Sequence, residues 1–130
     1  MDWSYIAGFF DQKGNINIIK VKGREYIQIR FYSDSKDILE KMRQFLECGR
    51  IYVNKLSKKN KRWHDRFELT ITSIEDIFIV LSQILPFLFI KQAKVENLLI
   101  NHKALSKFSN YLAAEGKEKE EEKETVSYIG

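Results

Sequence analysis

The chain has 130 residues, of which 44% are hydrophobic and 31% charged, with a formal net charge of +4. This is the size of one ordinary domain with enough apolar residues for a core, which excludes a wholly disordered chain. The single cysteine, Cys48, excludes an intramolecular disulfide, and no CxxC or HxxxH spacing indicates a structural zinc site.

Nothing in the sequence predicts a membrane segment or a targeting segment. The longest apolar run, residues 84–90, is too short to cross a bilayer. The first residues lack the basic start and apolar stretch of a signal peptide. We therefore expect an intracellular protein, cytoplasmic or organelle-encoded in a mitochondrion or chloroplast. Cys48 is expected to be a small buried hydrophobe near a helix end.

The charges are unevenly distributed along the chain. Residues 115–124 carry six Glu and three Lys, and because the whole chain carries +4, the part before this stretch carries +7. We predict one domain over 1–113, followed by a charged tail over 114–130. The basic residues of the domain cluster around one short segment, as expected of a phosphate-contacting patch or of a solvated hairpin loop. They are Lys55, Lys58, Lys59, Lys61, Arg62 and Arg66.

The spacing of apolar residues predicts a helix followed by a hairpin at the start of the chain. Residues 3–12 have a helical pattern, whereas 15–22 and 25–32 alternate between polar and apolar, as strands do. Gly23-Arg24 is expected to form the turn between the two strands. The first hairpin would then have one buried face and one polar-aromatic face.

A second helix and a second hairpin follow. The predicted helix covers 36–47, and the strands cover 50–56 and 63–72, joined by the basic loop 57–62. Val53 is expected to face the core, as are Ile51 and the apolar residues of the second strand.

Two more helices complete the predicted domain. One starts at 73–76 and runs to Leu85, where Pro86 breaks it. The last covers roughly 91–108, with His102 on its surface. The predicted fold class is α+β: four antiparallel strands form one sheet, and the helices cover only its Ile-rich face.

The uncovered face of the sheet would be polar, basic and aromatic with few carboxylates. Such a face suits the major groove of DNA or single-stranded RNA, and the alternative is an ordinary solvated sheet face. The arginines could recognise guanine, Gln28 or Asn54 could recognise adenine, and the loop cations would hold phosphates. The predicted base contacts are Asn15, Asn17, Tyr26, Gln28, Arg30, Tyr32, Arg50, Tyr52, Asn54, His64, Arg66, Glu68 and Thr70. The predicted phosphate contacts are Lys58, Lys59, Lys61 and Arg62.

Two segments resemble the LAGLIDADG homing endonucleases. Residues 6–14, IAGFFDQKG, are similar to the signature of that family, and residues 85–93, LPFLFIKQA, are similar to the segment before its late helices. The resemblance covers roughly 3–108 and implies the αββαββα fold of the family. One motif in a chain of this length implies a homodimer built on the first helix. The implied dimer-interface residues are Ala7, Gly8, Phe9 and Asp11.

The resemblance fails at the residue that binds metal in the family. There, the residue before the last glycine is a carboxylate that holds Mg²⁺ over the scissile phosphate, whereas this chain has Lys13. Only the backbone carbonyl of Gln12 is left as a weak metal ligand. Lys91 matches the basic residue that the family places near the cleavage centre. The resemblance therefore implies an endonuclease whose cleavage is impaired, by natural loss or by a laboratory substitution.

Three functions agree with these features. The first is sequence-specific binding of a long pseudopalindromic duplex by a homing endonuclease of an intron or intein that no longer cuts efficiently. The second is an RNA-binding maturase that helps an intron RNA to fold, for which the metal carboxylate is dispensable. The third is a non-cleaving DNA-binding regulator of the same fold. A function unrelated to nucleic acid is the remaining alternative.

Overall fold

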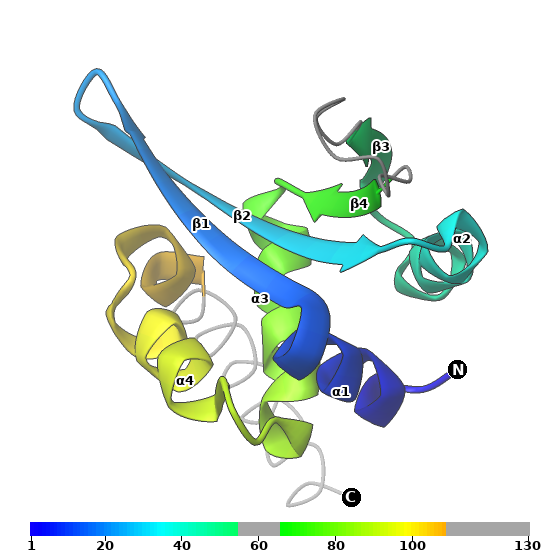
Figure 1. Ribbon diagram of the computed structural model, residues 1–130. Helices are drawn as coiled ribbons and strands as arrows, with labels where there is room; N and C mark the ends of the chain where they lie inside the picture. The colour runs from blue at the N-terminus through cyan, green and yellow to red at the C-terminus, as the bar shows by residue number, and fades with distance from the viewer. Residues whose placement is uncertain (55–65, 109–130) are drawn as a thin grey trace, which may run out of the picture.

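The computed structural model describes residues 1–54 and 66–108, which form an α+β fold with one four-stranded sheet (Figure 1). Its elements are α1 (Trp3–Lys13), β1 (Gly14–Val21), β2 (Arg24–Ser33), α2 (Lys36–Leu46), β3 (Arg50–Asn54), β4 (Arg66–Ile71), α3 (Ile74–Ile84), the 3-10 helix η1 (Leu85–Phe87) and α4 (Gln92–Asn101). The predicted order of helices and strands is confirmed over this part of the chain. The basic loop and the predicted tail lie outside the described residues.

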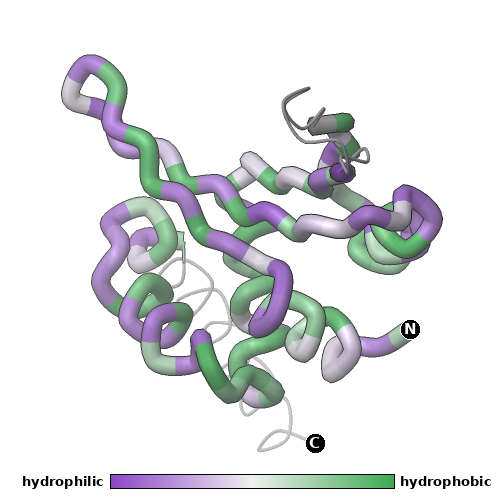
Figure 2. The backbone as a smooth tube through the Cα atoms, in the orientation of Figure 1, coloured by the Kyte–Doolittle hydropathy of each residue, from purple (hydrophilic) through white to green (hydrophobic). Residues whose placement is uncertain are grey.

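The sheet is antiparallel throughout, with the strand order β1-β2-β4-β3. Burial alternates along β2, where Ile27, Ile29 and Phe31 are buried and the residues between them are not. Figure 2 shows the same alternation of hydrophilic and hydrophobic residues along the hairpin. Because side chains alternate between the two faces of a strand, one face enters the core and the other is free for polar groups.

The turn of the first hairpin lies one residue earlier than predicted. Val21 pairs with Arg24, so the turn residues are Lys22 and Gly23, with φ of 50° and 77°. A two-residue turn with positive φ at both positions matches the twist of the strands. Glycine takes the second position because it has no Cβ to strain there.

The core lies between the sheet and the helices. The end of α1 packs into it, with Phe10 lying close to the start of β1. Ile6 and Phe10 of α1 are fully buried, and Phe10 contacts Phe31 of β2 with ring centroids 5.4 Å apart. A Cβ at Gly14 would lie 2.2 Å from the Phe10 ring, so only glycine lets the chain pass directly from α1 into β1. The side chain of Asp2 caps the start of α1 by accepting a hydrogen bond from Tyr5 N at 2.9 Å.

After β2, the structure differs from the prediction in four respects. α3 ends at Ile84, and Pro86 falls in η1, because a 3-10 turn accepts proline near its start. The last predicted helix is interrupted at His102, whose ψ of 125° is extended, and residues 103–108 form a further helical segment. His102 is therefore buried, with 7% exposure, and not on the surface as predicted. Val53 is 48% exposed and not in the core as predicted, because β3 is one of the two edge strands of the sheet.

Within 1–54 and 66–108, no helix has the length and apolar character needed to cross a membrane.

Candidate nucleic-acid interface

The polar side of the sheet carries rows of side chains that cross several strands. In the strand register, Asn15, Arg30, Thr70 and Arg50 form one row across all four strands. Tyr32, Glu68 and Tyr52 form the neighbouring row across β2, β4 and β3. The structure therefore brings these predicted contact residues together on one surface, which we call the polar face.

Arg30 is held in place by its neighbours on the polar face. Its Nη2 donates a hydrogen bond to Gln28 Oε1 at 2.9 Å, and its Nε lies 3.8 Å from Glu68 Oε1. The hydroxyl of Thr70 donates to the same Glu68 oxygen at 3.1 Å. The guanidinium is thus oriented before any ligand arrives, which reduces the entropy lost when it binds one.

Glu68 and Thr70 lie on the polar face but are only 8% and 7% exposed. Both belong to β4, an interior strand of the sheet, and longer residues flank them in the register. Glu68 is therefore placed to orient Arg30. Its low exposure makes it a poor direct contact for a ligand. Arg66, at the start of β4, is exposed and stacks its guanidinium 4.8 Å from the centre of the Tyr32 ring.

The other predicted contact residues are placed as follows. Asn15 Nδ2 donates to Asn17 Oδ1 at 3.2 Å, so these two amides form a pair on β1. Tyr26 and Tyr52 are exposed by about half, at 50% and 48%. Asn54 ends β3, and its side chain is not described. Five predicted contacts lie outside the described residues: Lys58, Lys59, Lys61, Arg62 and His64.

Lys91 reaches the end of α1, where the family signature places its reacting groups. Its Nζ donates hydrogen bonds to the carbonyl oxygens of Phe10 at 3.1 Å and Asp11 at 2.7 Å. It also lies 5.6 Å from the centre of the Phe10 ring. A cation at the C-terminal end of a helix interacts favourably with the helix dipole. Lys91 is thus a helix-capping cation, and a role in phosphate contact stays a prediction.

This end of α1 does not fit a divalent metal ion. Both carboxylate oxygens of Asp11 are occupied by backbone donors, from Phe89 N at 2.7 Å and Lys91 N at 2.9 Å. Lys13 is an exposed cation and Lys91 is a second one nearby on the same helix end. Mg²⁺ prefers carboxylate oxygens, and ammonium groups repel it. No cluster of metal-ligating side chains occurs among the described residues.

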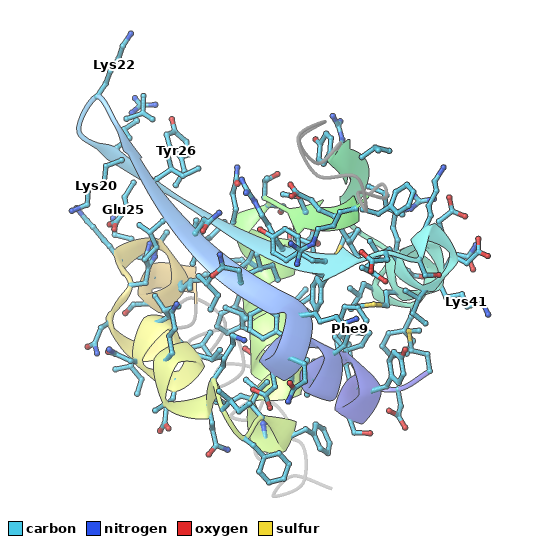
Figure 3. The ribbon with its side chains drawn as sticks, in the orientation of Figure 1. Phe9, Lys20, Lys22, Glu25, Tyr26 and Lys41 are labelled. Carbon is cyan, nitrogen blue, oxygen red and sulfur yellow. The ribbon has the colours of Figure 1, made fainter. Side chains whose placement is uncertain are left out.

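Two of the predicted dimer-interface residues face the chain's own core. Ala7 is 0% exposed and Asp11 is 6% exposed, so neither offers a surface to a partner. The reason is helix geometry: both lie on the buried side of α1, together with Ile6 and Phe10, and Asp11 there meets the backbone of Phe89 and Lys91. Gly8 is exposed, and a Cβ there would meet nothing within 4 Å. Phe9, labelled in Figure 3, is half-buried against Phe31.

The apolar residues before α4 are unusually exposed, and no sequence pattern identified them as a site. Phe89 is 92% exposed, Ile90 67% and Phe87 47%. The two backbone hydrogen bonds to Asp11 hold this segment against α1. We call Tyr5, Gly8, Gln12, Phe87, Phe89 and Ile90 the α1 surface. Their exposure is visible only once the fold shows that nothing in the described chain covers them.

Cys48 follows the end of α2, as predicted, but is half-buried and not buried. Burial, with a smaller effect from Asp76, raises the pKa of its thiol to about 11. The thiol therefore stays protonated at neutral pH, as expected of a structural cysteine.

Solved structures with a similar fold include homing endonucleases bound to DNA. The homing endonuclease I-CvuI, in complex with its target, is similar with 22% identity and a TM-score of 0.57. The match covers 75% of this chain and 62% of the I-CvuI chain. The LAGLIDADG meganuclease I-AabMI bound to uncleaved DNA is similar over 92% of this chain and 42% of its own, with 20% identity and a TM-score of 0.63. The archaeal intron-encoded homing endonuclease I-Vdi141I, complexed with DNA, is similar over 87% of this chain and 82% of its own, with 18% identity and a TM-score of 0.57.

The chain therefore has the fold of the LAGLIDADG homing endonucleases, as its sequence motifs predict. It spans less than two thirds of the I-CvuI chain and less than half of the I-AabMI chain. No protein-family model matches the sequence, and no curated protein is similar to it.

Proposed function

We propose that this chain is a LAGLIDADG-type protein that binds a long duplex DNA site with its polar face and does not cleave it efficiently. The observation that carries the proposal is the oriented Arg30 on an open sheet face, held by Gln28 and Glu68. The guanidinium of arginine has five N–H donors, so the hydrogen bond from Arg30 Nη2 to Gln28 leaves enough N–H groups to donate two hydrogen bonds to guanine in the major groove. The solved homing endonucleases of the same fold are complexed with DNA, which supports duplex DNA as the ligand.

The proposed assembly is a homodimer packed through the α1 surface. A glycine with open space around it lets a second helix approach closely, and the exposed Phe89 and Ile90 extend the apolar contact area. The lengths of the neighbours support this. One chain of I-AabMI is more than twice as long as the part that matches, whereas this chain spans 82% of I-Vdi141I. Two copies of a chain with one unit would present two polar faces to a pseudopalindromic site.

Impaired cleavage follows from the charges at the end of α1. The metal-binding carboxylate of the family is replaced by Lys13, and the nearest carboxylate, Asp11, is committed to backbone donors. An ammonium group in this place would instead attract a DNA phosphate directly. Binding to DNA is therefore expected to need no divalent ion.

The proposal is tested by selecting the purified chain on a randomised duplex library and, in parallel, on a pool of structured intron RNA. We expect enrichment of one pseudopalindromic duplex sequence in the presence of EDTA. The matched variant is Arg30→Ala, compared with Arg43→Ala on the exposed side of α2. Enrichment of RNA alone would contradict the proposal and favour the maturase function. Equal binding of all duplexes, unaffected by Arg30→Ala, would contradict the role of the polar face.

A further inference from the structure

A pocket of about 460 Å³ lies at the far end of the β1–β2 hairpin, away from the centre of the polar face. The hairpin passes the helical segment 103–108 there, as Figure 1 shows. Tyr26, from the polar face, and Glu25, from the opposite face, both line it. In Figure 3, Glu25 lies on the side of the hairpin that faces this helical segment. The pocket, which we call the hairpin pocket, therefore opens at the rim of the polar face.

The lining of the hairpin pocket is basic. Arg24 contributes from the start of β2, and Lys103 and Lys107 from the helical segment, against one carboxylate, Glu25. Three cations facing one anion leave a net positive charge. Such a pocket favours an anion with several acceptor oxygens.

His102 adds a buried group that still needs a partner. Its side chain is 4% exposed and lines the hairpin pocket, and neither ring nitrogen makes a hydrogen bond within the described residues. Glu25 Oε2 lies 4.0 Å from Nε2, beyond hydrogen-bond distance. Buried polar groups in proteins are nearly always hydrogen-bonded, so the partner of this ring is expected to come from outside the described residues.

We propose that the hairpin pocket binds a phosphate group, with His102, Arg24, Lys103 and Lys107 as donors. A phosphate supplies acceptor oxygens to the ring and to the three cations at once. The backbone break at His102 supports this assignment, because it turns the ring inward where a continuous helix was expected.

The expected source of the phosphate is the DNA backbone. This assignment of the source rests on the proposed function. Arg24 lies six positions before Arg30 on the same strand, a distance of roughly 20 Å at the usual strand rise. For a duplex lying along the polar face, this corresponds to about six base pairs outward from the Arg30 contact. The pocket would thus hold a backbone phosphate near the end of the site. Free phosphate is the other source with the same chemistry.

The first arm of the test observes His102 itself by NMR of the histidine ring nitrogens. The chain has only two histidines, and a His64→Ala variant assigns the signals. We expect the His102 signals to shift on addition of a duplex that reaches the pocket, or of inorganic phosphate alone. A shift with phosphate but not with duplex identifies free phosphate as the source. An absence of shift with either ligand overturns the proposal.

The second arm measures DNA affinity against salt for a Lys103→Gln/Lys107→Gln variant. If the pocket holds backbone phosphate, the slope of log K against log salt flattens by about 0.9 for each lost contact. A duplex shortened by the outer six or so base pairs should show no difference between variant and parent. The control is Lys94→Gln, an exposed lysine of α4 outside the pocket. An unchanged slope on the long duplex overturns the DNA source.

The two arms also separate this proposal from the proposed function. If the parent chain binds no duplex but phosphate shifts His102, the proposed function fails and the phosphate pocket stands. If Arg30→Ala weakens duplex binding while His102 responds to nothing, the proposed function stands and the pocket fails.

Discussion

Asp11 and Lys91 hold each other through hydrogen bonds that run in both directions. The backbone N–H of Lys91 donates to Asp11 Oδ1 at 2.9 Å, and Lys91 Nζ donates to the carbonyl oxygen of Asp11 at 2.7 Å. The other carboxylate oxygen of Asp11 accepts from Phe89 N at 2.7 Å. This pair joins the end of α1 to the segment before α4, although the two residues are 80 positions apart. Asp11 is thereby a structural anion that fixes the segment before α4 to the end of α1.

Asp11→Asn should destabilise the chain by about 1–3 kcal/mol, because the amide accepts only one of the two hydrogen bonds and turns a donor toward the other. The measurement is urea unfolding followed by circular dichroism. The matched control is Glu96→Gln, an exposed carboxylate of α4. Equal unfolding midpoints for Asp11→Asn and the parent would contradict the structural role of Asp11.

Gly8→Leu should convert the proposed dimer into a monomer without unfolding it. A Cβ at Gly8 meets nothing within 4 Å in the chain itself, so the larger side chain is a steric problem only for a partner helix. Sedimentation velocity checks the mass, and circular dichroism checks the fold. Leucine substituted for exposed Lys94 is the control. A parent chain that is monomeric at all concentrations would exclude the homodimer.

Arg30→Ala should weaken binding by about 1–3 kcal/mol at one base-pair position and relax the sequence preference there. Glu68→Gln should have a smaller effect in the same direction, because it removes the charge beside Arg30 Nε without removing the base contact. The effects of Arg30→Ala and Glu68→Gln are measured as affinities for a panel of single-base variants of the selected site. A loss that is equal on every sequence would show that Arg30 contacts phosphate and not a base.

Cys48 should react slowly with thiol reagents in the folded chain. Its folded pKa is about 11, against an ordinary value of 9.0, because burial and then Asp76 disfavour the thiolate. The thiolate fraction at pH 8 is therefore on the order of 100-fold lower than in the unfolded chain. The same shift works against the folded state as pH rises between 9 and 11. Alkylation rates at pH 8 with and without urea test this, and equal rates would contradict it.

Periodicity in the sequence predicts most of the fold, because the apolar spacing changes clearly between helices and strands. It does not predict the break at His102, since 91–108 keeps a helical pattern on both sides of it. The polar face could likewise be predicted from alternation along β2. The burial of Glu68 could not, because it depends on β4 lying between β2 and β3, a strand order that no local pattern encodes.

The orientation of α1 could not be predicted from the sequence either. The motif identifies α1, but its small residues do not reveal which side of the helix the chain's own core takes. Ala7 turned out to face inward and Gly8 outward, a difference of about 100° around the helix. The exposed Phe89 required the fold as well, since an apolar residue in a sequence is first expected inside.

The central proposal is that Lys13 lets this chain bind DNA through its polar face without needing or using a divalent ion. The most direct measurement compares the parent with Lys13→Glu on the selected duplex, for affinity and strand cleavage, in EDTA and in Mg²⁺. The account predicts that the parent binds equally in both and leaves the duplex intact. Lys13→Glu should bind weakly in EDTA, because its carboxylates repel phosphate, and should regain affinity in Mg²⁺. Cleavage by the parent in Mg²⁺, or a parent that binds duplex only with Mg²⁺, would contradict the account.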